Sequence, residues 1–130
     1  MTRDEMNRLS EAIIGCAISV HKELGPGLLE STYEACLEFE LLQKGLRVER
    51  QKELPVVYRG VRVECGYRID LLVNEAVLLE LKAVERVDKI HEAQLHTYLR
   101  LSGLHLSLLL NFNVVRMVDG IKRVVHGSMD

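Results

Sequence analysis

The chain has 130 residues, of which 48% are hydrophobic and 28% charged, and its net charge at pH 7 is −2. This length suits a single domain spanning residues 1–130, and the composition is that of a soluble globular protein. No apolar run approaches the roughly 20 residues that cross a bilayer, and the N-terminus lacks the basic-then-apolar order of a signal peptide. We therefore expect no membrane partner, and the negative net charge alone argues weakly against nucleic acid.

Two helices are expected first. Residues 4–24 carry an apolar stripe at helical spacing, and Gly25-Pro26-Gly27 would end that helix. A second helix is expected over residues 28–44, with Tyr33 on its apolar face and Gly45 after its end. Glu30 lies in its first turn, where a carboxylate suits the helix dipole and needs no functional explanation.

From Arg47 onward the period of the apolar residues changes to two, which predicts strands. A strand or two should follow, interrupted near Pro55, with a turn at Arg59-Gly60. From Val61 to Val73 the apolar residues alternate without a break, which predicts one long strand. The next strand is expected over Val77 to Lys82.

The register of these last two strands depends on the length of the loop at Asn74-Glu75. A two-residue loop would place Glu80 among aliphatic side chains, at a cost of several kcal/mol or with neutralisation of the acid. We therefore expect an odd loop that pairs residue 73 with 77, 71 with 79 and 69 with 81. That register gathers the apolar residues on one face and places Asp70 opposite Glu80 and Arg68 opposite Lys82.

Two carboxylates about 5 Å apart at their Cβ atoms would repel each other. Arg68 and Lys82 could compensate, or a divalent cation could lie between Asp70 and Glu80. Two acids, a backbone carbonyl and waters form a typical oxygen set for Mg²⁺. The ammonium of Lys82 could then polarise a water or stabilise charge on a phosphate. The alternative is a structural ion cluster on an exposed sheet face.

The rest of the chain completes an α/β domain. A third helix is expected over residues 88–102, with Asp88 as N-cap and Gly103 after its end. Its Gln94 and Tyr98 are one turn apart on the same face. The run "LHLSLLLNF" predicts a strand covered on both sides, followed by a turn at Asp119-Gly120 and a last short strand. The expected order is α-α-β-β-β-α-β-β.

Residues 44–68 form a locally basic segment, with seven basic and three acidic residues in an acidic protein. The segment could line a groove for phosphates, with Lys52, Arg62 and Arg68 as candidates. An ordinary solvated strand surface is an equally good explanation.

The three cysteines, Cys16, Cys36 and Cys65, match neither a zinc motif nor a disulfide framework. Each has apolar neighbours in the sequence. We expect buried free thiols in a reducing cytoplasm.

The ordered set of Asp70, then Glu80-Leu81-Lys82, then Gln94-x-x-x-Tyr98 resembles the PD-(D/E)XK nuclease superfamily. The upstream "GLLESTY", residues 27–33, is similar to the signature of its G-x-x-E-x-x-Y family. The resemblance extends from about residue 8 to residue 126. Ile69 stands where the superfamily motif has proline.

The resemblance implies a restriction-endonuclease-like core, a mixed central sheet flanked by helices. It implies Mg²⁺ or Mn²⁺ as cofactor, held by Asp70, Glu80, the carbonyl of Leu81 and Glu30, with Lys82 as the catalytic lysine. Gln94 and Tyr98 would support the site or contact the nucleic-acid backbone.

We accordingly expect a phosphodiesterase acting on DNA, in which a metal-activated water attacks and in which Gln94 and Arg68 orient the phosphate. The alternative is a catalytically idle module of the same fold that binds nucleic acid or a protein partner. The small positive surface favours that alternative, and a homodimer could supply more of it.

Overall fold

The computed structural model describes residues 1–64 and 66–128. The helices are α1 (Arg3–Leu24), α2 (Glu30–Gln43) and α3 (Lys89–Ser102), with a 3₁₀ helix η1 (Met117–Gly120). The strands are β1 (Val48–Glu53), β2 (Val56–Tyr58), β3 (Val61–Val63), β4 (Arg68–Val73), β5 (Val77–Lys82), β6 (Leu106–Asn111) and β7 (Ile121–Val125). The expected order is therefore correct except between α2 and α3, where five strands replace the expected three.

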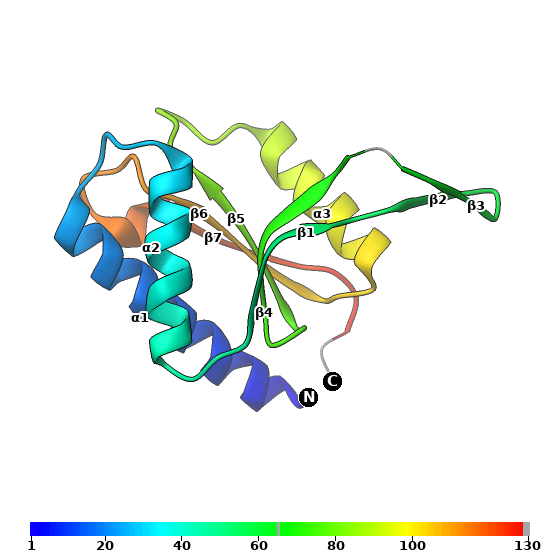
Figure 1. Cartoon of the computed structure of the whole chain (residues 1–130), viewed down its shortest axis with the longest axis horizontal. Coiled ribbons are helices and arrows are strands. Elements are labelled where there is room, and N and C mark those ends of the chain that lie inside the picture. Colours follow the sequence, from blue (N-terminus) through cyan, green and yellow to red (C-terminus); the bar gives the residue numbers. More distant parts are fainter. Residues whose placement is uncertain (65, 129–130) are drawn as a thin grey trace.

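Five strands form one mixed sheet in the order β1-β4-β5-β6-β7, in which only the β5–β6 pair is parallel. The parallel pair is joined through α3, the usual crossover for parallel strands. Helices α1 and α2 cover one face of the sheet and α3 covers the other (Figure 1). The predicted α/β class, with a mixed sheet flanked by helices, is confirmed.

The helix ends follow the expected signals. Helix α1 is capped at its N-terminus by Thr2, whose hydroxyl accepts a hydrogen bond of 3.1 Å from the N–H of Glu5. It ends at Gly25, whose φ of 68° suits glycine. Helix α3 is preceded by Asp88 and ends at Gly103, which has the left-handed conformation. Among the described residues, no helix has the length and apolarity needed to cross a bilayer.

The β4–β5 hairpin has the odd loop that the sequence predicts. Val73 pairs with Val77 and Leu71 with Leu79, around a loop in which Asn74 and Glu75 both have positive φ. The side-chain oxygen of Asn74 also accepts a hydrogen bond of 2.8 Å from the N–H of Arg47. The loop and the start of β1 are thereby fastened together.

The predicted pairing of Ile69 with Leu81 is wrong. Leu71 and Leu81 pack in the core beside α1 and α2, whereas Ile69 packs in the core beside α3. Side chains two positions apart share a face on a regular strand, so the pleat of β4 is interrupted at Asp70. Opposite Asp70, β1 carries Gln51 with a φ of 53°; this pair is missing from the β1–β4 ladder, although the register is the same on both sides of it.

The predicted long strand from residue 61 to 73 is also wrong. Strand β3 ends at Val63, and β4 begins at Arg68, after Gly66 with a φ of 75°. The alternation of apolar residues continues across this break, but it cannot reveal the positive φ of Gly66 within the break. Strands β2 and β3 instead form a separate two-stranded sheet that projects from the body of the protein (Figure 1).

Two of the three cysteines lie in the described part of the chain. Cys16 is buried and free, as expected, whereas Cys36 is free but only half-buried. Burial raises the pKa of the Cys16 thiol above its ordinary value, which keeps it protonated and unreactive. The expectation for Cys65 falls outside the described residues.

Candidate active site

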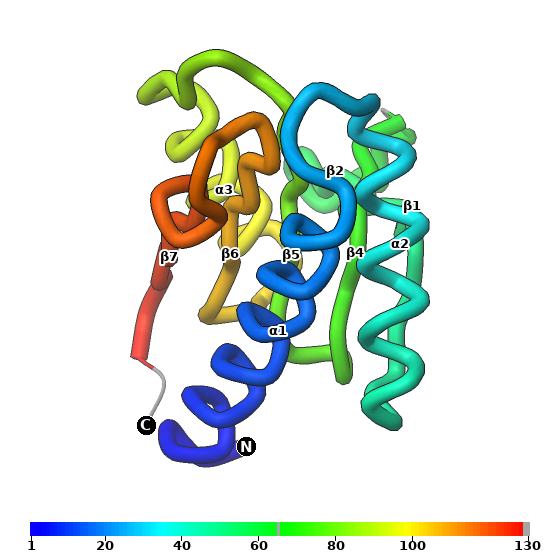
Figure 2. Tube along the Cα trace, turned by 90° about the vertical axis from the view of Figure 1, so that its left-hand side faces the viewer, coloured from blue at the N-terminus to red at the C-terminus, as the bar shows by residue number. Residues whose placement is uncertain are grey.

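Helix α2 packs against one face of the sheet, where it contacts β1, β4 and β5, and it lies alongside β1 and β4 in Figure 2. Its start is held by Tyr33, which is buried and stacks on Phe112 with ring centroids 4.5 Å apart. The hydroxyl of Tyr33 donates to the carbonyl of Gly25 at 2.6 Å and accepts from the N–H of Leu28 at 3.1 Å. Tyr33 therefore ties the loop between α1 and α2 to the core, which positions Glu30.

A cavity of about 220 Å³ lies where the start of α2 meets β1, β4 and β5. It brings together three of the residues predicted to hold a metal, Glu30, Asp70 and Leu81, with three that the sequence did not single out, Ser31, Glu34 and Gln51. Of the described residues, neither Glu80 nor Lys82 lines this cavity.

The carboxylate of Asp70 is held at both oxygens. Its Oδ2 accepts a hydrogen bond of 2.9 Å from the N–H of Leu81, and its Oδ1 accepts one of 3.2 Å from Nε2 of Gln51. Burial raises the pKa of Asp70 above its ordinary value, and the charge of Glu34 acts in the same direction, while these hydrogen bonds and Lys82 act against it. The site thus favours a positive charge near Asp70.

Glu80 lies on β5 between Leu79 and Leu81 and is only 7% exposed. Burial and then the charge of Asp70 raise its pKa to about 8, although Lys82 and the peptide N–H of Asp70 lower it. In the described part of the chain, Glu80 Oε1 is a buried oxygen without a hydrogen-bond partner. A buried carboxylate oxygen in this state is costly unless a cation or a proton neutralises it.

These residues fit a hydrated divalent cation rather than a complete protein cage. Among the described residues, there is no group of three or more His, Cys, Asp or Glu side chains that could hold a metal ion. Mg²⁺ does not require one, because it commonly keeps several waters and binds through one or two carboxylates. The donor set of Asp70, Glu80 and the Leu81 carbonyl suits that mode.

Gln94 and Tyr98 contact each other on the inner face of α3. Nε2 of Gln94 donates to the hydroxyl of Tyr98 at 3.0 Å, and Tyr98 is 6% exposed. Burial raises the pKa of Tyr98, the hydrogen bond from Gln94 lowers it, and the charge of Glu80 raises it further. The Gln94–Tyr98 pair therefore lies near Glu80, on the face of the sheet opposite α2.

Three of the seven basic residues of the 44–68 segment form ion pairs with acids in the described structure, namely Arg50, Lys52 and Arg62. Lys52 forms an ion pair of 2.7 Å with Glu49, and Arg62 forms one of 2.7 Å with Glu64. Arg68 is exposed and donates to the carbonyl of Gln51 at 3.3 Å.

The predicted position of Arg68 opposite Lys82 is not observed. Arg68 pairs with Glu53 of β1 on one side, but on the other side the β4–β5 register ends at Leu71 and Leu79. The predicted pairing of Asp70 with Glu80 is absent from this ladder for the same reason. The ladder ends there because the N–H of Leu81 donates its hydrogen bond to the side chain of Asp70 and not to a backbone carbonyl of β4.

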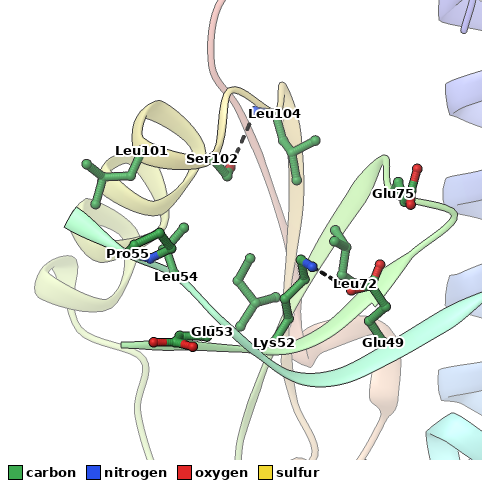
Figure 3. A pocket seen from close by; sticks show the side chains of 11 residues that line it. Glu49, Lys52, Glu53, Leu54, Pro55, Leu72, Glu75, Leu101, Ser102 and Leu104 are labelled. Carbon is green, nitrogen blue, oxygen red and sulfur yellow. Dashed lines mark hydrogen bonds and ion pairs between the residues drawn. The ribbon is translucent and has the colours of Figure 1, made fainter. Parts of the chain in front are cut away.

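A larger cavity, of about 390 Å³, lies on the α3 face of the sheet (Figure 3). Its floor is aliphatic and its rim is mainly acidic; the lining residues are Glu49, Lys52, Glu53, Leu54, Pro55, Ile69, Leu72, Glu75, Leu101, Ser102 and Leu104. Of the candidate site residues only Lys52 lines it. Size alone therefore does not identify the candidate active site; the two perturbed carboxylates do.

Sequence reasoning missed Glu34 and Gln51. Glu34 is buried, and its oxygens accept from Gln51 Nε2 at 2.6 Å and from Arg50 Nε at 3.1 Å. Its position one turn after Glu30 is a usable signal, because residues four apart lie on the same side of a helix. Gln51 carries no comparable signal, since one polar residue on an alternating strand is ordinary.

The sequence was compared with family models, curated proteins and solved structures. The family model described as the PD-(D/E)XK nuclease superfamily matches residues 7–124. The searches of curated proteins and of solved structures found no match. The order Asp70, Glu80, Lys82 on two adjacent strands agrees with this family match, which spans nearly all of the chain. The chain therefore belongs to the PD-(D/E)XK nuclease superfamily.

Proposed function

We propose that this protein is a Mg²⁺-dependent nuclease that hydrolyses phosphodiester bonds in DNA. The observation that carries the proposal is the buried, unpartnered Oε1 of Glu80 beside a second carboxylate, Asp70, whose pKa is also raised. In native structures the large majority of buried acid oxygens have a hydrogen-bond partner, so this oxygen of Glu80 supports a cation-binding role over a purely structural ion cluster. Membership of a nuclease superfamily supports the same reading.

In this proposal Asp70, Glu80, the carbonyl of Leu81 and Glu30 would hold the metal. A bound magnesium ion supplies Lewis-acid activation of water and neutralises charge on the phosphate. Lys82 is half-buried and follows Glu80 by two residues, so its ammonium would orient the attacking water.

The remaining candidates would act on the nucleic acid. Arg68 and Gln94 would orient the phosphate, with Tyr98 holding Gln94 through the hydrogen bond between them. Lys52 and Arg62 would contact the backbone farther from the cut, after exchanging their acidic partners for phosphates.

Within the superfamily, we propose the G-x-x-E-x-x-Y family. Each residue of that signature has a distinct place in the structure. Gly27 has a φ of 98°, Glu30 lines the cavity, and Tyr33 fastens the loop between them to the core. In this proposal, the residues of the signature position Glu30, at the start of α2, beside the cavity.

A second candidate function is supported by the β2–β3 sheet. Val56 pairs with Val63 and Tyr58 with Val61, so these four apolar side chains lie on one face of a projecting hairpin. Tyr58 and Val61 are 60% and 63% exposed. Such a face suits a nuclease-fold module that binds a partner without cutting nucleic acid, including a second copy of the chain.

The test is cleavage of linear and circular DNA, and of RNA, with Mg²⁺, with Mn²⁺ and with EDTA. We expect metal-dependent cleavage of DNA by the wild type and none by Lys82→Ala, with the fold of the variant intact by circular dichroism. Lys89→Ala is the matched control, because it removes an exposed lysine from the first turn of α3. Nucleic acid bound but never cut would favour the second candidate, and full activity of Lys82→Ala would remove that lysine from the mechanism.

A further inference from the structure

The side-chain amide of Gln51 lies between two carboxylates. Its Nε2 is 2.6 Å from Oε1 of Glu34 and 3.2 Å from Oδ1 of Asp70. An amide NH₂ group has two hydrogens, so it can donate one to each acid. This placement separates two negative charges that would otherwise repel each other across the cavity.

The backbone of Gln51 is unusual for the middle of a strand. Its φ is 53°, although Arg50 and Lys52 on either side pair regularly with β4. A left-handed conformation costs a residue other than glycine about 1 kcal/mol or more, so the surrounding structure must maintain it. Residues held in this way cluster at functional sites.

The left-handed conformation has a specific geometric consequence. Consecutive side chains on a regular strand point to opposite faces, so they cannot reach the same group. Here Arg50 and Gln51 both reach the carboxylate of Glu34, at 3.1 Å and 2.6 Å. The unusual φ of Gln51 is thus what turns its amide toward α2 and the cavity.

Glu34 is a fixed anchor for this amide. It is 6% exposed, and each of its oxygens accepts a hydrogen bond, one from Arg50 and one from Gln51. Arg50 also contacts Glu38 at 3.5 Å, which ties the guanidinium to the next turn of α2. These contacts fix the Glu34 carboxylate, so it can hold the amide of Gln51 in place.

We propose that Gln51 is a positioning residue, which holds the carboxylate of Asp70 in place for metal binding through the Arg50–Glu34–Gln51–Asp70 chain of contacts. This inference rests on the proposed function. The N–H of Leu81 holds one oxygen of Asp70 and Gln51 holds the other, and each oxygen keeps a lone pair for a cation. Partners of this kind around a metal ligand are typically worth 10- to 100-fold in metal affinity.

The test is Mn²⁺ binding to the whole chain by isothermal titration calorimetry, which requires no cleavage. Gln51→Gly removes the amide while accepting the positive φ, and it should weaken Mn²⁺ binding by about 10- to 100-fold. Glu75→Gly is the matched control, because Glu75 also has a positive φ, 54°, but lies in the β4–β5 loop. The control should bind Mn²⁺ as the wild type does.

A second variant guards against loss of folding. Gln51→Asn tolerates the left-handed conformation but is too short to bridge Glu34 and Asp70, so it should also lose affinity. In cleavage assays both variants should lower kcat with little change in KM for DNA, because Gln51 acts on Asp70 and not on the substrate. Wild-type Mn²⁺ affinity in folded Gln51→Gly or Gln51→Asn would overturn the inference alone, whereas a wild type that binds no Mn²⁺ would overturn the proposed metal site as well.

Discussion

The N–H of Leu81 donates a hydrogen bond of 2.9 Å to Oδ2 of Asp70, where a regular ladder would use a backbone carbonyl. The residue between Glu80 and Lys82 is therefore fastened to the acid of the neighbouring strand. This contact joins the two strands that carry the predicted motif residues, and the β4–β5 ladder ends at Leu71 and Leu79. The candidate active site lies where the two strands separate.

The stability of the metal-free protein should depend on pH through Glu80. Its pKa is about 8 in the folded protein against an ordinary 4.5, so the folded state holds a proton that the unfolded chain has released. The stabilisation from that proton is complete below pH 4.5 and is lost as the pH rises toward 8. Glu80→Gln should remove this dependence and be more stable than the wild type above pH 8, by on the order of 5 kcal/mol.

Urea denaturation between pH 5 and pH 9, in EDTA, measures this difference. Glu85→Gln, which changes an exposed acid, should follow the wild type. Parallel curves for the wild type and Glu80→Gln across the whole range would show that Glu80 titrates normally.

Divalent metal should stabilise the protein by binding the folded state alone. Mg²⁺ or Mn²⁺ at 100 times its Kd should add about 2.7 kcal/mol to the free energy of unfolding. The bound cation would also keep Glu80 ionised, so the loss of stability between pH 4.5 and 8 should shrink. Asp70→Asn should lose most of the metal effect, because it removes one of the two acids.

Thermal melting with and without metal, in the wild type, Asp70→Asn and Glu85→Gln, makes this comparison directly. An unchanged melting temperature of the wild type at millimolar metal would favour the module that binds without cutting.

Removal of the Tyr33 hydroxyl should destabilise the protein. Tyr33→Phe keeps the stacking on Phe112 but leaves the carbonyl of Gly25 and the N–H of Leu28 without this partner. Such a change typically costs about 1–3 kcal/mol. Tyr58→Phe, on the exposed hairpin, is the control and should be close to neutral.

The free energies of unfolding of both variants can be compared in urea. If Tyr33→Phe were as stable as Tyr58→Phe, the hydroxyl would not be holding the start of α2. The metal affinity of Tyr33→Phe is a separate measurement. It shows whether the position of Glu30 depends on the hydrogen bonds of the Tyr33 hydroxyl.

The sequence by itself determined the class of fold, the approximate bounds of the three helices and of β5, and the odd β4–β5 register. These depend on local periodicity and on turn residues such as Asn74-Glu75, which are properties of short segments. The expected reason for the register was wrong, because Glu80 is buried in the odd register as well. The motif residues Asp70, Glu80 and Lys82 also pointed to the superfamily that the comparison then showed.

The tertiary structure alone decided how the candidate site is supported. The break in the pleat at Asp70, the separation of β3 from β4, and the bridge from Glu34 through Gln51 have no signature in the apolar alternation. They arise from left-handed residues and from contacts between segments far apart in the chain. A local pattern of apolar residues predicts which face of a strand a side chain prefers. The left-handed backbone of Gln51 departs from that pattern because partners distant in the sequence, Glu34 on α2 and Asp70 on β4, stabilise it.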